Sequence, residues 1–145
     1  MTRYLVDTNV VSEVLRPRPE PVVLDWLRDH GEGLWTTSIV VAEMLSGVAL
    51  LPPGRRRDGL SAGVIAVLED RFADRVLPFD GAAAAEYAVV RARSEREGRV
   101  VGDLDLMIAA VARVHGAVVA TRNVRHLAAA GAEAIDPWAG SPRGA

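Results

Sequence analysis

Short apolar runs alternate along the chain with longer segments in which apolar residues recur at helical spacing, and this alternation limits the possible folds most strongly. The runs cover residues 4–6, 34–37 and 117–120. Each has the length of a strand but lacks the regular polar alternation of a strand that faces water on one side. Strands of this kind need cover on both faces, as in a parallel sheet between layers of helices. The pattern therefore predicts an α/β fold.

Proline, glycine and capping residues divide the rest of the chain into helices and two weaker strands. Residues 75–78 form a short strand that Pro78 places at the edge or end of the sheet, because proline cannot donate to a neighbouring strand. A last extended piece is expected at residues 134–136. Helices are expected over residues 10–15, 22–27, 39–51 with Ser38 as the cap, 60–72, 81–97 and 103–115.

The length and charge of the chain indicate one ordinary domain. A domain of 145 residues buries roughly 68–70% of the surface that its unfolded chain exposes, which suffices for a core without disulfides or metals. We expect this domain to cover residues 1–139 and a flexible tail to cover residues 140–145. The net charge of −2 argues against a polycation but allows local basic patches. Without a signal-peptide core or an apolar run of membrane length, the expected location is cytoplasmic, with no membrane association.

Two missing residue types exclude much chemistry. All 17 basic residues are arginine, and the chain has no cysteine. Schiff bases, Walker-type phosphate binding by lysine, thiol nucleophiles and thiolate zinc sites are therefore excluded. The histidines, His30, His115 and His126, lack the spacing of metal ligands, and no Gly-x-Ser-x-Gly motif is present. Catalysis would have to come from carboxylates, hydroxyls, arginines or the three histidines.

Two polar clusters follow strands of the expected sheet. Asp7 is followed by Thr8 and Asn9 after the first strand, and Thr121 and Asn123 follow the late strand. In open α/β sheets, functional groups gather outside the carboxyl ends of the strands. The alternative for the first cluster is that Asp7, Thr8 or Asn9 only caps the helix that comes next.

Three further carboxylates stand in apolar surroundings. Glu43 lies in a helix that is hydrophobic on nearly every side, so we expect the helix to be buried. A buried glutamate is rare unless it is paired or binds a metal, and a salt bridge to an arginine is the alternative. Asp103 and Asp105 begin another apolar helix, where one of them is explained as a cap and the second is surplus to that.

These distant carboxylates lead to the hypothesis that they converge on a cation. Two unit charges 4 Å apart repel by about 4 kcal/mol at an effective dielectric constant of 20, so a cluster needs a cation or shared protons. Oxygen ligands without thiolates or a histidine pair favour Mg²⁺ or Mn²⁺ over Zn²⁺. Such ions activate water and neutralise charge in phosphoryl transfer.

The chain resembles the PIN-domain nucleases, and within them the VapC-type ribonuclease toxins of bacterial toxin–antitoxin pairs. The resemblance rests on Leu-Val-Asp-Thr-Asn at residues 5–9, on Glu43 followed by Gly47, on residues 105–110, and on Thr-Arg-Asn at residues 121–123. It implies a three-layer α/β/α sandwich around a parallel sheet of about four or five strands. It also implies an Mg²⁺- or Mn²⁺-dependent endoribonuclease in which Asp7, Glu43 and Asp105 are the catalytic, metal-binding acids.

The resemblance also suggests supporting residues and partners. Asn123 stands where many members place a fourth acid, so it would hold water or phosphate, while Asp103 is the other candidate to complete the site. Thr8 and Thr121 would orient carboxylates or water, and Arg122 would bind the substrate phosphate. The expected partners are an RNA substrate, a cognate antitoxin whose segment covers the site, and a second copy in a homodimer.

Two other functions stay open at this point. Because Asp7 ends a first strand, the chain could be an aspartyl-phosphate domain of receiver or haloacid-phosphatase type. Receiver domains need a lysine, however, and the phosphatases need an aspartate where Asn9 stands. The chain could also be a non-catalytic PIN-fold module that works through partners, because residues 22–27, 39–51 and 64–72 could offer an apolar groove or dimer face.

Overall fold

The computed structural model describes residues 1–140 and contains one parallel five-stranded sheet with the strand order β3-β2-β1-β4-β5. The α/β class is therefore confirmed, and the sheet has the upper number of strands expected. β3, which holds the residues before Pro78, lies at one edge as predicted. The strands are β1 (Tyr4–Val6), β2 (Leu34–Thr37), β3 (Val76–Leu77), β4 (Val118–Ala120) and β5 (Ala134–Ile135).

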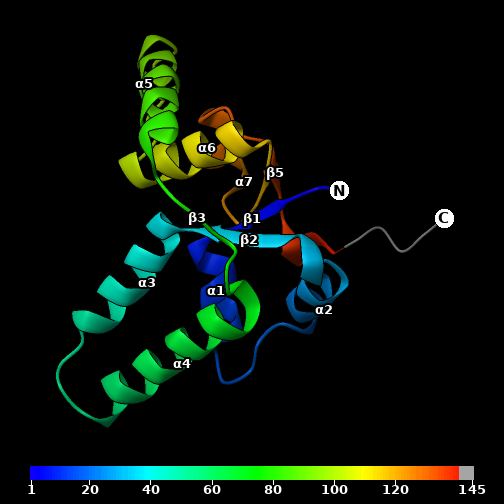
Figure 1. Ribbon diagram of the computed structural model, residues 1–145, viewed down its shortest axis with the longest axis vertical. Coiled ribbons are helices and arrows are strands. Elements are labelled where there is room, and N and C mark those ends of the chain that lie inside the picture. The colour runs from blue at the N-terminus through cyan, green and yellow to red at the C-terminus, as the bar shows by residue number, and fades with distance from the viewer. Residues whose placement is uncertain (141–145) are drawn as a thin grey trace.

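Helices cover both faces of this sheet. In Figure 1, α5 and α6 lie above the sheet, and α1 and α4 lie below it, which gives the three-layer sandwich. The helices are α1 (Thr8–Val14), α2 (Pro21–Asp29), α3 (Ser38–Ala49), α4 (Arg55–Phe72), α5 (Gly81–Arg96), α6 (Asp103–His115) and α7 (Val124–Ala129), with short 3-10 helices η1 (Gly31–Gly33) and η2 (Pro137–Ala139).

The centre of the sheet brings the ends of two strands together. β1 is paired in parallel with β4, and Val6 stands beside Ala120. Leu5 and Val119 have no exposed surface, as expected for strands that are covered on both faces. Both strands run in the same direction, so Asp7 and Thr121, the residues that follow them, lie next to each other at the carboxyl edge of the sheet.

One helix differs clearly from its predicted environment. α3 was predicted to be buried because it is hydrophobic on nearly every side, and this prediction is wrong. Its buried residues are Ile39, Val40 and Met44, whereas Leu45 and Leu50 are exposed by 43% and 85%. Figure 1 shows why, because α3 and α4 extend away from the sheet as a pair. Only the beginning of α3 and the side that faces its neighbours can be covered.

Helix starts also differ in detail. Thr37, and not Ser38, occupies the N-cap of α3, while the Ser38 hydroxyl accepts a hydrogen bond from the Phe79 N–H. Gly102 occupies the N-cap of α6, so Asp103 is the first helical residue and does not cap it. α7 was not predicted, because it is only six residues long and its residues form no long apolar stripe.

Two further expectations concern the chain as a whole. The predicted tail begins at Gly140, and its residues 141–145 lie outside the described part of the chain. Among residues 1–140, no helix combines the length and the hydropathy required to span a bilayer.

Candidate active site at the carboxyl edge of the sheet

Asp7 and Thr121 form the buried floor of the candidate site. The Asp7 N–H donates to Ala120 O at 3.0 Å, which continues the pairing of β1 with β4. The Thr121 hydroxyl donates to Asp7 Oδ2 at 2.7 Å, and the Thr8 N–H donates to Oδ1 at 2.7 Å. Asp7 as a residue is only 4% exposed and Thr121 is fully buried. Asp7 therefore caps α1, as the alternative interpretation proposed, and also stands at the strand end with its carboxylate held from both sides.

Asn9 connects this floor to the loop after β4. Its amide nitrogen donates to Thr121 Oγ1 at 3.2 Å and to Asp7 Oδ2 at 3.4 Å, while its amide oxygen accepts from the Arg122 N–H at 3.1 Å. The Asn123 N–H donates to Thr121 Oγ1 at 3.0 Å. These bonds fix the backbone of the loop and engage neither the Arg122 guanidinium nor the Asn123 amide group. Both side chains line the cavity described next.

Glu43 and Asp105 face the same open cavity as Asp7. The cavity has a volume of about 450 Å³ and lies at the carboxyl edge of the sheet. Glu43 comes from the middle of α3 and Asp105 from the first turn of α6, and each is half-buried. The fold thus brings together three carboxylates that are far apart in the sequence. The remaining lining residues are Thr8, Asn9, Ser12, Glu13, Arg16, Arg122, Asn123 and Trp138.

The carboxylates in this cavity perturb one another. Burial raises the pKa of Glu43 above its ordinary value, and the negative charges of Asp7 and Asp105 raise it further. The nearby Thr8 side chain partly opposes this shift, although its buried oxygen meets no partner with hydrogen-bond geometry. Burial also raises the pKa of Asp105, with a further increase from Asp7. Two of the three acids are therefore held where their charged forms are disfavoured.

This donor set suits a hard divalent cation in its chemistry. Asp7, Glu43 and Asp105 offer only oxygen atoms, and none of the three forms a salt bridge to any residue in the described range 1–140. Within that range, no three His, Cys, Asp or Glu side chains are already close enough together to hold a metal ion. A cation would therefore have to draw Glu43 and Asp105 towards the fixed carboxylate of Asp7, and it would relieve their repulsion.

Asp103 does not join this group. Its exposed carboxylate accepts from Tyr87 Oη at 3.3 Å and forms an ion pair with Arg91 at 3.3 Å. It lines a separate hollow beside α5 and α6. The structure thus places Asp103 away from Asp7, while Asp105, two residues later, faces the shared cavity.

Glu13 is a cavity residue that sequence reasoning did not single out. Burial alone would raise the pKa of Glu13, but a hydrogen bond from the Glu20 N–H and the Arg16 guanidinium outweigh it and lower the pKa. The contacts measure 3.1 Å to Glu20 N and 3.2 Å to Arg16 Nη1. Its position four residues after Asn9 in α1 was the available signal, because residues at that spacing share a helix face.

Two further residues near the acids were also missed. The charge of His126 on α7 partly opposes the rise in the pKa of Asp105, so the imidazole lies within electrostatic reach. Trp138 lines the cavity from η2, and the Arg122 Cζ atom lies over its ring at 4.4 Å from the centroid. No local pattern marks either residue, because α7 and η2 are short and irregularly patterned.

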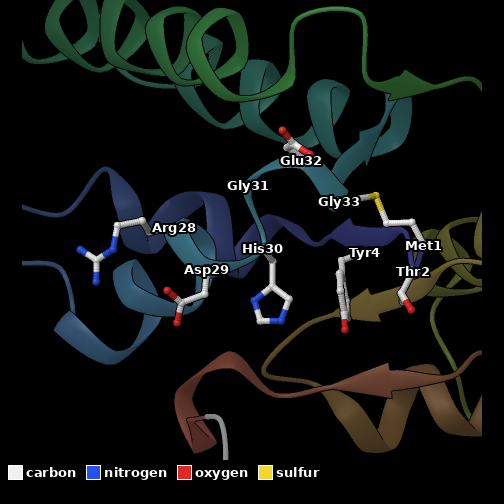
Figure 2. A pocket seen from close by; sticks show the side chains of 9 residues that line it. All are labelled: Met1, Thr2, Tyr4, Arg28, Asp29, His30, Gly31, Glu32 and Gly33. Atoms are coloured by element: carbon white, nitrogen blue, oxygen red, sulfur yellow. The ribbon is translucent and has the colours of Figure 1, made fainter.

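A second cavity of similar size lies elsewhere, and its lining residues do not form a cluster of carboxylates. Its volume is about 430 Å³, and it is lined by residues 1–2, 4 and 28–33. Figure 2 shows His30 and Tyr4 side by side in it, with Glu32 on the opposite side of the ribbon. The rings of Tyr4 and Trp26 both pack against His30, whose Nδ1 atom lies 2.7 Å from Trp26 O. These contacts explain the cluster as packing, so the cavity with the three acids is the candidate active site.

Known proteins are similar to this chain in both sequence and fold. The model of the PIN domain family matches residues 4–132. The chain is 39% identical over 135 residues to the VapC ribonuclease Y4jK of Sinorhizobium fredii, covering 92% of this chain and 96% of the relative. It is 39% identical over 135 residues to toxin FitB of Neisseria gonorrhoeae, covering 92% and 97%. The crystal structure of FitAcB from Neisseria gonorrhoeae superposes with a TM-score of 0.85 at 39% identity, covering 93% of this chain and 98% of that chain.

Proposed function

Because the chain belongs to the PIN-domain family, we propose that it is a divalent-cation-dependent endoribonuclease and the toxin of a toxin–antitoxin pair. One observation carries the proposal: Asp7, Glu43 and Asp105, from three separate elements, face one cavity at the carboxyl edge of the sheet. The relatives named ribonuclease and toxin support the assignment. Nothing in the cavity favours the aspartyl-phosphate alternative, since the chain has no lysine and Asn9 is engaged with Asp7 and Thr121.

In this proposal Asp7, Glu43 and Asp105 hold Mg²⁺ or Mn²⁺. The bound ion supplies charge neutralisation and an activated water for attack on an RNA phosphodiester. Asp7 is the fixed ligand, because Thr121 and the Thr8 N–H hold its two oxygens. The raised pKa values of Glu43 and Asp105 mean that their charged forms are disfavoured when no cation is present, and a bound cation would offset this.

The substrate is held beside these acids by uncharged and basic groups. The Arg122 side chain is exposed and has no carboxylate partner among the described residues. A guanidinium is a good bidentate donor to phosphate. Asn123 presents an amide to the same cavity, where it binds water or a phosphate oxygen. Arg122 and Asn123 thus bind the substrate backbone, whereas the three acids carry the chemistry.

A groove beside the active site suits the antitoxin. It is lined mainly by apolar residues of α3, of α4 and of the segments that follow α1 and α3, and it shares Thr8, Ser12, Arg16 and Glu43 with the catalytic cavity. Because the groove and the cavity have these four lining residues in common, an antitoxin segment in the groove would lie beside the active site and could cover it as well. The exposed Leu45 on α3 and Leu50 at its C-cap provide apolar surface for a second copy of the chain, which would form the homodimer.

An RNA cleavage assay with two matched aspartate variants tests the proposal. Wild-type protein should cleave an RNA pool with Mn²⁺ or Mg²⁺ and lose activity in EDTA. Asp7→Asn should lower the cleavage rate at least about 100-fold, because an amide removes the charge that the ion requires. Asp103→Asn makes the same change outside the cavity and should retain activity. Full cleavage by Asp7→Asn, or by wild-type protein in chelator, would refute the proposal.

A further inference from the structure

Trp138 stands at the rim of the catalytic cavity on a rigid support. The backbone N–H of Trp138 donates to Asp136 Oδ1 at 2.8 Å, and this bond caps η2. The preceding residue, Pro137, is buried. Its side chain packs against the core, and its indole nitrogen is buried without a partner among the described residues. Because the backbone is capped and the side chain packs against the core, the orientations open to the indole are restricted.

The Arg122 guanidinium lies over the Trp138 ring. The Arg122 Cζ atom lies 4.4 Å from the centroid of the Trp138 ring, within the range of a cation–π interaction. The backbone of Arg122 is held independently, because its N–H donates to Asn9 Oδ1 at 3.1 Å. Arg122 is therefore fixed at both ends, and its positive charge reaches into the cavity far enough to help lower the pKa of Glu13.

A cation–π contact holds an arginine without using its hydrogen-bond donors. Arg16, the other arginine of the cavity, is paired with Glu13 at 3.2 Å and so has donors already engaged. Arg122 has no such carboxylate partner within residues 1–140. The tryptophan ring attracts the guanidinium through its electrons alone, so the N–H groups of Arg122 stay available for a phosphate.

We propose that Trp138 is a positioning residue that holds the Arg122 guanidinium at the rim of the acidic cavity, where it binds an RNA phosphate. This inference rests on the proposed nuclease function and assigns a task to a residue that has no other evident one in the site. In this proposal Trp138 acts through Arg122 and does not stack on a base, because the Arg122 guanidinium already lies over its ring.

RNA binding by four variants, built in the cleavage-deficient Asp7→Asn protein, tests this role. The variants are Trp138→Leu, Trp138→Phe, Arg122→Ala and the double variant of Arg122→Ala with Trp138→Leu. Binding of a labelled single-stranded RNA is measured over a series of salt concentrations. Trp138→Leu should weaken binding about 2- to 30-fold, the range of a cation–π contact. Trp138→Phe keeps an aromatic face and should restore most of the affinity.

The double variant distinguishes positioning from direct contact. If Trp138 acts through Arg122, then Trp138→Leu has no further effect once Arg122 is alanine. Arg122→Ala should also reduce the salt dependence of log K by about 0.7, which corresponds to one phosphate contact on single-stranded nucleic acid. An undiminished effect of Trp138→Leu in the Arg122→Ala protein would mean that the ring contacts RNA itself and would overturn the inference.

A measurement without RNA covers the case in which Trp138→Leu does not fold. In ¹⁵N-labelled wild-type protein, the Arg122 Nε–H proton should be shifted upfield by the indole ring current, and Trp138→Phe should reduce that shift. An unshifted proton would overturn the inference on its own. RNA binding that is equal in all variants would overturn the roles of both Trp138 and Arg122 and would leave the roles proposed for the three acids untouched. If the Asp7→Asn parent and the wild-type protein both fail to bind RNA, the proposed function fails and this inference fails with it.

Discussion

Replacing Thr121 by valine tests how firmly the fold holds the Asp7 carboxylate. The change keeps the shape of the side chain but removes the hydroxyl that donates to Asp7 Oδ2 at 2.7 Å. Hydrogen bonds to a charged group contribute about 1.5–3 kcal/mol to stability. Since Thr121 is fully buried and Asp7 is 4% exposed, water cannot readily replace the lost donor. The Thr121 hydroxyl oxygen also accepts hydrogen bonds from the Asn9 side-chain amide and the Asn123 backbone N–H. Both residues are closer to solvent than Thr121.

These contacts give an expected loss of about 2–3 kcal/mol in the free energy of unfolding for Thr121→Val, most of it from the bond to Asp7. The assay is urea unfolding at pH 7 in EDTA, with Thr121→Ser as the control because serine keeps the hydroxyl. Cleavage by Thr121→Val should also fall, because one Asp7 oxygen is no longer held. If Thr121→Val lost less than about 0.5 kcal/mol, or if the serine variant lost as much as the valine variant, the argument would be refuted.

The remaining predictions concern the charges of the cavity. Because the pKa values of Glu43 and Asp105 are raised in the folded protein, these groups stabilise it below the ordinary carboxyl pKa of about 4, and this contribution is lost as pH rises through the raised values. In EDTA, the melting temperature of Asp105→Asn should therefore fall less than that of wild-type protein between acidic and neutral pH, and parallel curves would contradict this. Glu13→Gln should lower the melting temperature at pH 7, because the pairing with Arg16 is lost, and Arg16→Gln should give a smaller loss since Arg16 is exposed. Equal stability of Glu13→Gln and wild-type protein would show that this buried contact is unimportant.

The sequence predicted best those parts of the site that follow directly from strands. Asp7 and Thr121 each come after a short apolar run, and the pairing of Val6 with Ala120 makes their meeting a consequence of the topology. The positions of Glu43 and Asp105 were inferred from charges in apolar helices, although α3 turned out to be partly exposed. That error arises because an apolar sequence shows that a surface needs cover and does not show which molecule provides it.

The parts that the sequence did not predict depend on distant contacts. Asp103 and Asp105 both lie in the first turn of α6, and the sequence does not distinguish them. Their positions in that turn decide that Asp103 pairs with Arg91 and that Asp105 lines the cavity. Trp138 reaches Arg122 because β5 lies at the edge of the sheet next to β4. Such neighbours are set by the tertiary fold, so no local pattern could indicate them.

The central claim is that Asp7, Glu43 and Asp105 share one divalent ion. The most direct test is a crystal structure of the protein soaked in Mn²⁺, with the metal located by its anomalous scattering. The account predicts one manganese peak in the cavity, with oxygen atoms of all three carboxylates moved to about 2.0–2.6 Å from it. A metal-free cavity at saturating Mn²⁺, or an ion bound elsewhere with these three carboxylates still apart, would contradict the claim.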